Sequence, residues 1–146
     1  MIAVILSGHG TFASGVAEAI RLIVGEQEQF RFVDFKEGMT TEQLEVQIRQ
    51  DMAEIDINDG IVFLTDLLGG SPFRVASLIA QERNDVEVIT GTNLQMAAEM
   101  LLERGELNLV EFRQQALVCG HRGMTSLFDE LLKATEKEVE EINGGI

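Results

Sequence analysis

The sequence predicts an α/β domain with a doubly wound, mainly parallel, four-stranded sheet and helices on both faces. Short apolar runs rich in β-branched residues and Phe alternate with longer segments whose apolar residues recur every three or four positions. Such runs are typical of strands buried on both faces, and their alternation with helices favours right-handed crossovers between parallel strands. The expected strands are residues 2–6, 30–35, 61–64 and 86–89.

Helices are expected between the strands and after the last one, over residues 12–24, 41–55, 72–80, 94–102 and 109–117. The second of these shows the pattern most clearly, because its apolar residues fall on one stripe: Leu44, Ile48, Met52 and Ile55. A helix of this kind lies on a sheet with its apolar stripe inward. Asn93 is expected to cap the helix that follows it.

A single domain is expected over residues 1–133. The chain has 146 residues, of which 45% are hydrophobic, and this is enough for one well-buried core but not for two. Residues 123–133 fit a helix or a strand. Residues 134–146 carry four Glu against one Lys and end in a Gly-rich stretch, which predicts a frayed acidic tail.

The charge balance limits the partners. Eleven basic and 25 acidic residues give a net charge of −14, which argues against nucleic acid and anionic membranes and favours proteins with a positive patch. The single cysteine, Cys119, excludes an internal disulfide. The chain starts without the basic region of a signal peptide, and no apolar stretch approaches the ~18–20 residues of a membrane helix. We therefore expect a cytoplasmic protein.

Two glycine-containing loops follow the first and third strands, at residues 7–11 and 66–72. In a sheet of order 2-1-3-4 these loops face each other across the switch point, where ligands bind in doubly wound folds. His9 and Asp66 are then close enough to hydrogen-bond. A carboxylate bound to one ring nitrogen fixes the tautomer, so the other nitrogen carries a free lone pair and acts as a nucleophile. The two residues are the candidate catalytic pair, although a loop histidine also often caps a backbone carbonyl.

The second loop is a candidate phosphate site. Ser71 is expected at the N-cap and Pro72 at the first helical position, which is the usual place for proline. Gly69 and Gly70 leave backbone N–H groups free to converge, and a helix N-terminus after a glycine turn binds anions.

One alternative is a dinucleotide site. Gly8, Gly10 and Ala13 satisfy a G-x-G-x-x-A pattern after a strand, and Asp34 lies about twenty residues further on. Against it, four strands leave little room for a substrate domain, and a histidine in the glycine turn crowds the pyrophosphate. No spacing supports a metal site made from His9, His121 and Cys119. We expect no metal and no cofactor, with Cys119 a small core residue and His121 structural or at an interface.

The sequence resembles the mannose-family enzyme IIA of the bacterial phosphoenolpyruvate:sugar phosphotransferase system from Met1 to about Leu127. Three motifs carry the resemblance: Ser-Gly-His-Gly at 7–10, Thr-Asp-Leu-Leu-Gly-Gly-Ser-Pro-Phe at 65–73, and Thr-Gly-Thr-Asn-Leu at 90–94. The Leu-Leu, Thr-Gly-Thr-Asn and Cys-Gly-His-Arg-Gly features look closest to members that serve N-acetylgalactosamine or related sugars.

The resemblance implies a phosphoryl relay. The histidine-containing phosphocarrier protein would donate to His9, on Nε2, and the group would pass to a histidine of enzyme IIB and then to a sugar entering through membrane components IIC and IID. The family's aspartate falls on Asp66 and its glycine-serine loop on Gly69, Gly70 and Ser71. Family members are homodimers that exchange a C-terminal strand, which would correspond to part of residues 123–133.

Two departures from the family pattern stand out. No IIB domain follows in the sequence, so we expect IIB as a separate polypeptide, and the C-terminal segment is longer and more acidic than an exchanged strand requires. A regulatory module of the same fold, which only senses phosphorylation, is the alternative function.

Overall fold

A computed structural model describes residues 1–144 of the chain. Four parallel strands form one sheet in the order β2-β1-β3-β4: β1 (Ala3–His9), β2 (Phe30–Phe35), β3 (Ile61–Thr65) and β4 (Val86–Ile89). The predicted fold class and strand order are confirmed. Strand β1 runs three residues beyond the predicted end, because Ser7, Gly8 and His9 continue the pairing with β2.

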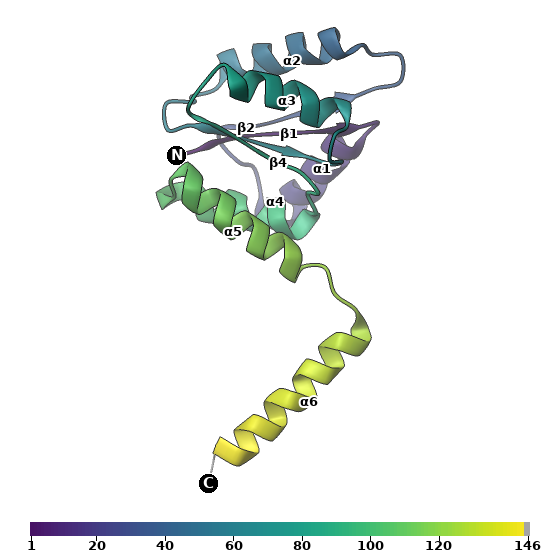
Figure 1. Ribbon diagram of the computed structural model, residues 1–146, viewed down its shortest axis with the longest axis vertical. Helices are drawn as coiled ribbons and strands as arrows, with labels where there is room; N and C mark the ends of the chain where they lie inside the picture. Colours follow the sequence, from purple (N-terminus) through teal and green to yellow (C-terminus); the bar gives the residue numbers. More distant parts are fainter. Residues whose placement is uncertain (145–146) are drawn as a thin grey trace.

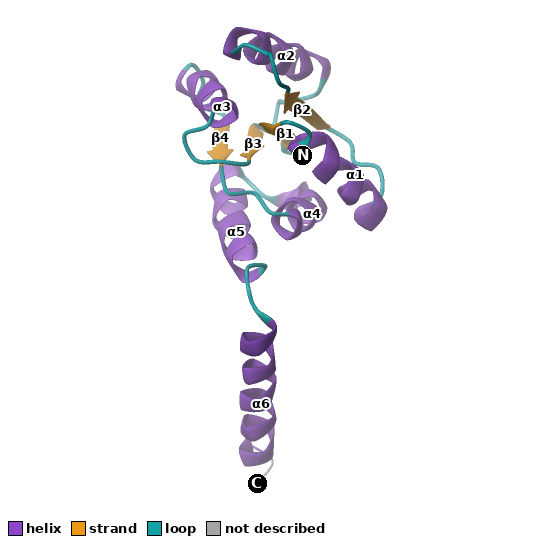
Figure 2. Ribbon diagram, turned by 90° about the vertical axis from the view of Figure 1, so that its right-hand side faces the viewer, coloured by secondary structure: helices purple, strands orange, loops and turns teal. Residues whose placement is uncertain are grey.

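Helices cover both faces of the sheet. α2 (Thr41–Glu54) and α3 (Ser71–Gln81) lie on one face, and α1 (Phe12–Val24), α4 (Leu94–Glu103) and α5 (Leu109–Arg122) lie on the other (Figures 1 and 2). Successive side chains along each strand point to opposite faces of the sheet, so they pack into two separate hydrophobic cores. Val4 and Leu6 pack with α1, α4 and α5, whereas Ile5 and Phe63 pack with α2 and α3.

Arg104 anchors the end of the sheet at which the strands begin. It opens the short 3₁₀-helix η1 (Arg104–Glu106) and is 1% exposed. Its guanidinium donates to the carbonyls of Ile2 and Gln29, at 3.0 Å each, and to that of Glu28. Burial lowers the pKa of Arg104 to about 10, so it stays charged at neutral pH. These bonds join the start of β1 to the turn before β2.

The C-terminal segment differs from the sequence expectation. Residues 123–133 fit a helix or a strand, and the resemblance implies an exchanged strand within them; residues 134–146 are expected to fray. Residues 127–144 instead form one helix, α6 (Leu127–Gly144), and residues 145–146 of the expected tail lie outside the described residues. Ser126 Oγ accepts the Asp129 N–H at 3.1 Å, which caps the helix. Glu and Lys are strong helix formers, and the apolar residues recur at helical spacing, so the segment favours a helix over a strand.

α6 stands apart from the α/β body, and none of its described residues is buried (Figure 1). Its exposed apolar side chains fall on one stripe, which we call the α6 stripe: Leu127, Phe128, Leu131, Leu132, Val139 and Ile142. Among the helices of residues 1–144, α6 included, none is long and apolar enough to cross a bilayer.

Candidate functional site

His9 is the last residue of β1 and lies at the edge of the sheet where the strands end. Gly10 follows it with φ of +59°, a left-handed conformation that glycine adopts without strain, and donates its N–H to the Phe35 carbonyl at 2.8 Å. The Phe35 ring meets the imidazole edge to face, with centroids 5.8 Å apart and an interplanar angle of 80°. The His9 side chain keeps 45% of its surface exposed.

Asp66 follows β3 and contacts His9, as the sequence predicts. Its Oδ2 accepts from His9 Nδ1 at 2.8 Å and from the His9 backbone N–H at 2.8 Å. Its Oδ1 accepts the Leu67 N–H at 2.8 Å. Partial burial raises the pKa of Asp66, but these hydrogen bonds together outweigh burial and leave the pKa below its usual value. The carboxylate is therefore ionised at neutral pH.

This contact determines the state of the imidazole. An ionised carboxylate accepts hydrogen bonds only, so Nδ1 carries the proton and Nε2 keeps its lone pair. Asp66 on one side and Phe35 on the other hold the ring in one orientation. The exposed Nε2 is then a nucleophile whose reaction leaves a positive ring beside a negative carboxylate.

The loop after Asp66 brings the N-terminus of α3 against His9. Gly69 has φ of +78°, and Gly70 approaches so closely that a Cβ built on it would lie 2.7 Å from His9 Cε1 and 3.5 Å from Nε2. The predicted cap is wrong by one residue: Gly70 is the N-cap, Ser71 is the first helical residue and Pro72 the second. The close approach to the ring requires glycine at this position. The Ser71 N–H points out of the first turn, where anions bind.

Two buried hydroxyls brace the strands beneath the site. Ser7 Oγ donates to the Val33 carbonyl at 2.8 Å, and Thr65 Oγ1 donates to the Ile89 carbonyl at 3.0 Å. Ser7 and Thr65 are themselves paired across β1 and β3. The residues before His9 and Asp66 are thus tied to the strands on either side, which fixes where the two side chains emerge.

The loop after β4 binds the backbone of Asp66. Gly91 donates its N–H to the Asp66 carbonyl at 3.2 Å. Asn93 caps α4, as predicted, by accepting the Met96 N–H at 2.9 Å, and its amide donates to the Gly120 carbonyl at 2.8 Å. The Asn93 side chain thus caps α4 with its oxygen and joins α4 to α5 with its amide nitrogen.

The geometry argues against a dinucleotide site. Asp34 Oδ1 accepts the Ser14 N–H at 2.9 Å, so a carboxylate already occupies the N-terminus of α1, where a pyrophosphate would bind. The Phe12 ring also covers Gly8, because a Cβ there would lie 2.4 Å from Phe12 Cδ1. The glycine pattern therefore serves packing between β1 and α1.

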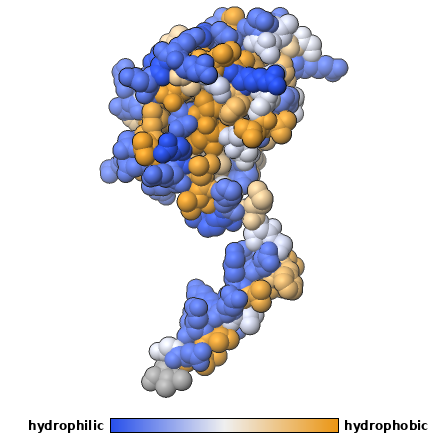
Figure 3. Space-filling view, in the orientation of Figure 1, coloured by the Kyte–Doolittle hydropathy of each residue, from blue (hydrophilic) through white to orange (hydrophobic). Residues whose placement is uncertain are grey.

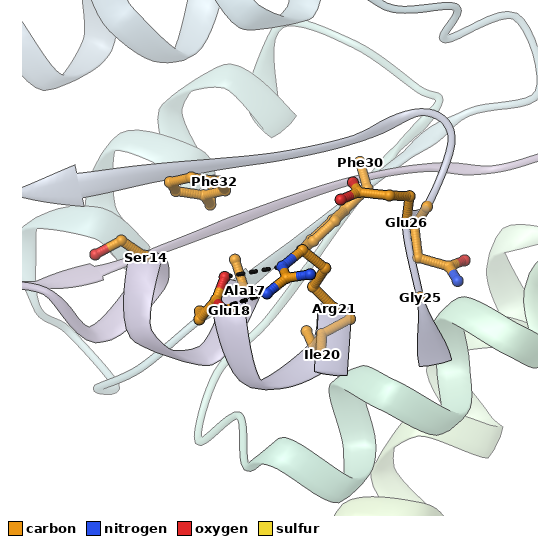
Figure 4. A pocket seen from close by; sticks show the side chains of 10 residues that line it. Ser14, Ala17, Glu18, Ile20, Arg21, Gly25, Glu26, Phe30 and Phe32 are labelled. Atoms are coloured by element: carbon orange, nitrogen blue, oxygen red, sulfur yellow. Dashed lines mark hydrogen bonds and ion pairs between the residues drawn. The ribbon is translucent and has the colours of Figure 1, made fainter. Parts of the chain in front are cut away.

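The hollows on the rest of the surface lack reactive groups. A groove of about 170 Å³ runs between α1 and the free edge of β2, and the Glu18–Arg21 ion pair lies on its wall (Figure 4). A second hollow of about 310 Å³ lies between α4 and α5 beside Cys119. Burial and the neighbouring Glu99 carboxylate raise the pKa of the Cys119 thiol to about 11, so it is protonated and unreactive.

The remaining candidates do not join the site. His121 is exposed on α5. Within residues 1–144, His, Cys, Asp and Glu side chains form no group of three or more that could hold a metal ion. Phe35 is the site residue that sequence reasoning missed, because it lies opposite His9 only in a β1 that runs three residues beyond the predicted strand.

Comparisons with known proteins agree with this architecture. Residues 3–117 match the EIIA-man family, described as the PTS (phosphotransferase) system fructose IIA component. The mannose-specific EIIAB component of Escherichia coli is 33% identical over 127 residues, covering 86% of this chain and 39% of that protein, so the chain spans about two fifths of this relative. The fructose-specific EIIA component of Bacillus subtilis is 32% identical over 109 residues, covering 75% of each chain.

A solved structure shows the same fold. The phosphotransferase system component EIIA from Streptococcus agalactiae superposes with a TM-score of 0.82 at 30% identity, covering 88% of this chain and 99% of that chain.

The approach of Gly70 to the imidazole generates a prediction. Gly70→Ala places a methyl group 2.7 Å from His9 Cε1, so the ring must move and its bond to Asp66 must weaken. We expect the Nδ1–H resonance of His9 in NMR spectra to shift or to exchange rapidly with water. Gly15→Ala is the matched control, because its Cβ meets nothing within 4 Å and helix propensity favours alanine. A His9 spectrum in Gly70→Ala identical to that of the control would contradict this account.

Proposed function

The chain belongs to the EIIA-man family of phosphotransferase-system IIA components, and we propose on this premise that it is a phosphoryl carrier with His9 as the acceptor. The proposal rests above all on one observation: Asp66 holds Nδ1 of His9 at 2.8 Å, which orients the ring and, in the neutral imidazole, places the lone pair on Nε2. The phosphorus–nitrogen bond forms at Nε2 as the bond to the donor's leaving atom breaks. In the neutral ring with its proton on Nδ1, no proton has to leave Nε2.

Asp66 and the α3 N-terminus stabilise the two charges that the transfer creates. Asp66 stays ionised and balances the positive imidazole, while the N–H groups of Gly69 and Ser71 receive the phosphoryl oxygens. The Gly70 N–H, expected from the sequence to be free, already donates to the Leu67 carbonyl at 3.1 Å, so Gly70 contributes its close approach to the ring and not a donor. Phosphoryl transfer depends mainly on positioning and on stabilising charge at the equatorial oxygens. Backbone amides and a helix N-terminus supply this without a metal or a cofactor.

The partners follow from the family. The donor is the histidine-containing phosphocarrier protein, and the acceptor is a separate enzyme IIB that serves the membrane components IIC and IID in sugar uptake. The relay takes place in the cytoplasm. The link to N-acetylgalactosamine stays a prediction, because the relatives reported above are named for mannose and fructose.

We propose that the chain is a homodimer and that a second copy covers the α6 stripe. Figure 3 shows apolar side chains gathered along one side of α6. α5 carries a second exposed stripe on its outer face, formed by Val110, Leu117 and Val118. Arg113 and Arg122 of α5 are already paired with Glu87 and Glu99, so apolar contact between the two stripes, rather than charge, is what favours this pairing of helices.

The central proposal is tested by labelling. His9→Ala should abolish phosphorylation by phosphoenolpyruvate in the presence of the two general phosphotransferase proteins, because no other histidine has a carboxylate-held ring. His121→Ala is the control and should label like the wild type. Gel detection of the acid-labile phosphate is the readout, and persistent labelling of His9→Ala would refute the assignment. Wild-type protein that accepts phosphate but passes none to any IIB would instead be a regulatory sensor.

Asp66→Asn tests the orienting carboxylate. The amide is neutral, so the positive ring loses its charged partner, and we expect the phosphorylation rate to fall about a hundredfold or more with the fold retained. Because the pKa of Asp66 is lowered, the wild type should keep its full advantage above about pH 4 and lose it only as the pH falls through that lowered pKa. Rapid-quench rates across pH measure both effects. Equal rates for the two proteins at neutral pH would exclude the orienting role.

The oligomeric state of the protein tests the proposed role of the α6 stripe. The double substitution Leu132→Gln with Val139→Gln places polar groups on the stripe, and we expect the dimer dissociation constant to rise at least tenfold. The substitutions Glu136→Gln and Glu140→Gln on the polar face form the matched control and should leave dimerisation intact. Sedimentation velocity gives the mass of each species. A monomeric wild type, or an unchanged dimer in the stripe variant, would disprove the interface.

A further inference from the structure

The loop between β3 and α3 exposes two adjacent leucines beside His9. Leu67 is 60% exposed and Leu68 is 73% exposed, and neither packs into the two cores of the α/β body. Single exposed apolar side chains are common on protein surfaces, so exposure alone assigns no function. This pair differs in its position, because the loop starts at Asp66 and ends at Gly70, and both of these residues lie against the His9 ring.

Backbone contacts hold the loop beside the imidazole. The Leu67 N–H donates to Asp66 Oδ1 at 2.8 Å, and the Leu67 carbonyl accepts the Gly70 N–H at 3.1 Å. A Cβ built on Gly70 would lie 3.3 Å from that carbonyl oxygen and 2.7 Å from His9 Cε1, which places the Leu67 backbone next to the ring. Leu67 makes these contacts with backbone atoms only, so a change of its side chain leaves them in place.

The surroundings of the ring are apolar on its other side as well. Phe35 comes from β2 and packs edge to face against the imidazole, and β1 lies between β2 and β3. The His9 ring therefore emerges between Phe35 and the loop that carries the two leucines. Residues 67–73 contain no charged side chain, although a quarter of the chain is charged. A partner that covers this loop meets an apolar surface.

Phosphoryl transfer between proteins requires that this surface be covered. The donor has to bring its phosphorus atom to bonding distance of His9 Nε2, so the donor's surface lies over the groups around that nitrogen. Even a small protein–protein interface covers about 600 Å² of each partner, a disc about 14 Å in radius. A disc of this size around Nε2 includes a loop whose two ends lie against the ring. The net charge of −14 does not attract a phosphoryl dianion, whereas burial of apolar side chains is favourable whatever the charge.

We propose that Leu67 and Leu68 form the docking patch for the phosphoryl-donor protein, and that this donor carries an apolar surface around its phosphorylated residue. The proposal rests on the proposed function and adds the surface through which the donor is recognised. The two leucines are specificity-determining residues: they act when the proteins meet, and His9 with Asp66 performs the chemistry.

The test compares Leu67→Gln/Leu68→Gln with the wild type and with Leu22→Gln/Ile23→Gln. Leu22 and Ile23 are the matched control, because they are an adjacent apolar pair, 72% and 60% exposed, in the last turn of α1, about 15 Å along the helix from its start. With the phosphorylated phosphocarrier protein as donor, we expect kcat/KM of the loop variant to fall about tenfold and that of the control to stay within about twofold of wild type. The loss should be the same at low salt and near 0.5 M salt, because salt screens charges and not apolar contacts.

A small donor separates docking from chemistry. Phosphoramidate needs no protein surface: its P–N bond breaks as the bond to His9 Nε2 forms, and ammonia leaves. We expect the wild type and both variants to take up phosphate from phosphoramidate at equal rates, with the same Nδ1–H resonance of His9 in NMR spectra.

Three results would overturn the proposal: equal kcat/KM of the loop variant and the control with the protein donor, a loss that high salt removes, or an equal loss with phosphoramidate. If the wild type takes up no phosphate from the protein donor, the proposed function itself fails, and the two failures remain distinct.

Discussion

The hydrogen bond between His9 Nδ1 and Asp66 Oδ2 is the contact on which the candidate site depends. It joins the ends of two strands that are 57 residues apart in sequence and adjacent in the sheet. Only a sheet in which β1 and β3 are neighbours brings these residues together, so the crossover that places α2 between β2 and β3 is a condition of the chemistry. The same carboxylate oxygen also accepts the His9 backbone N–H, which fixes the backbone and the ring of one residue together.

The hydrogen bonds that keep this contact rigid are made by residues that take no part in the proposed reaction. Ser7 and Thr65 are fully buried, and the hydroxyl of each donates a hydrogen bond to a backbone carbonyl of a neighbouring strand. A buried hydroxyl without a partner is costly, so these bonds resist any sliding of the strand ends. At the other end of the sheet, Arg104 holds the start of β1 in the same way. The imidazole is therefore preorganised by the whole sheet, and little reorganisation is needed when charge develops on it.

The sequence predicted the strand order and the His9–Asp66 contact because both follow from patterns along the chain: apolar runs of strand length, and glycine loops directly after two of them. The sequence did not predict the features that depend on contacts between segments distant along the chain. Phe35 against His9 and Arg104 against three carbonyls join segments with no shared local pattern. The N-cap of α3 is Gly70, one residue before the predicted Ser71, and the close contact of Gly70 with the ring of His9 has no local signal in the sequence. Residues 127–144 form a helix, and their apolar residues already recur at helical spacing in the sequence. The Gly-rich end and the exchanged strand implied by the resemblance pointed instead to a frayed tail and a strand.

The candidate site and the proposed dimer contact occupy different parts of the chain. Every residue of the candidate site lies within residues 3–117, the span that matches the family, whereas α6 lies beyond it. An isolated helix of 18 residues is marginal in water, and α6 buries none of its residues. In the dimer proposed above, burial of the α6 stripe would stabilise the helix, so folding of α6 and dimerisation would be coupled. In that dimer, changes in this helix would alter assembly without disturbing His9, because the α/β body encloses both of its cores without α6.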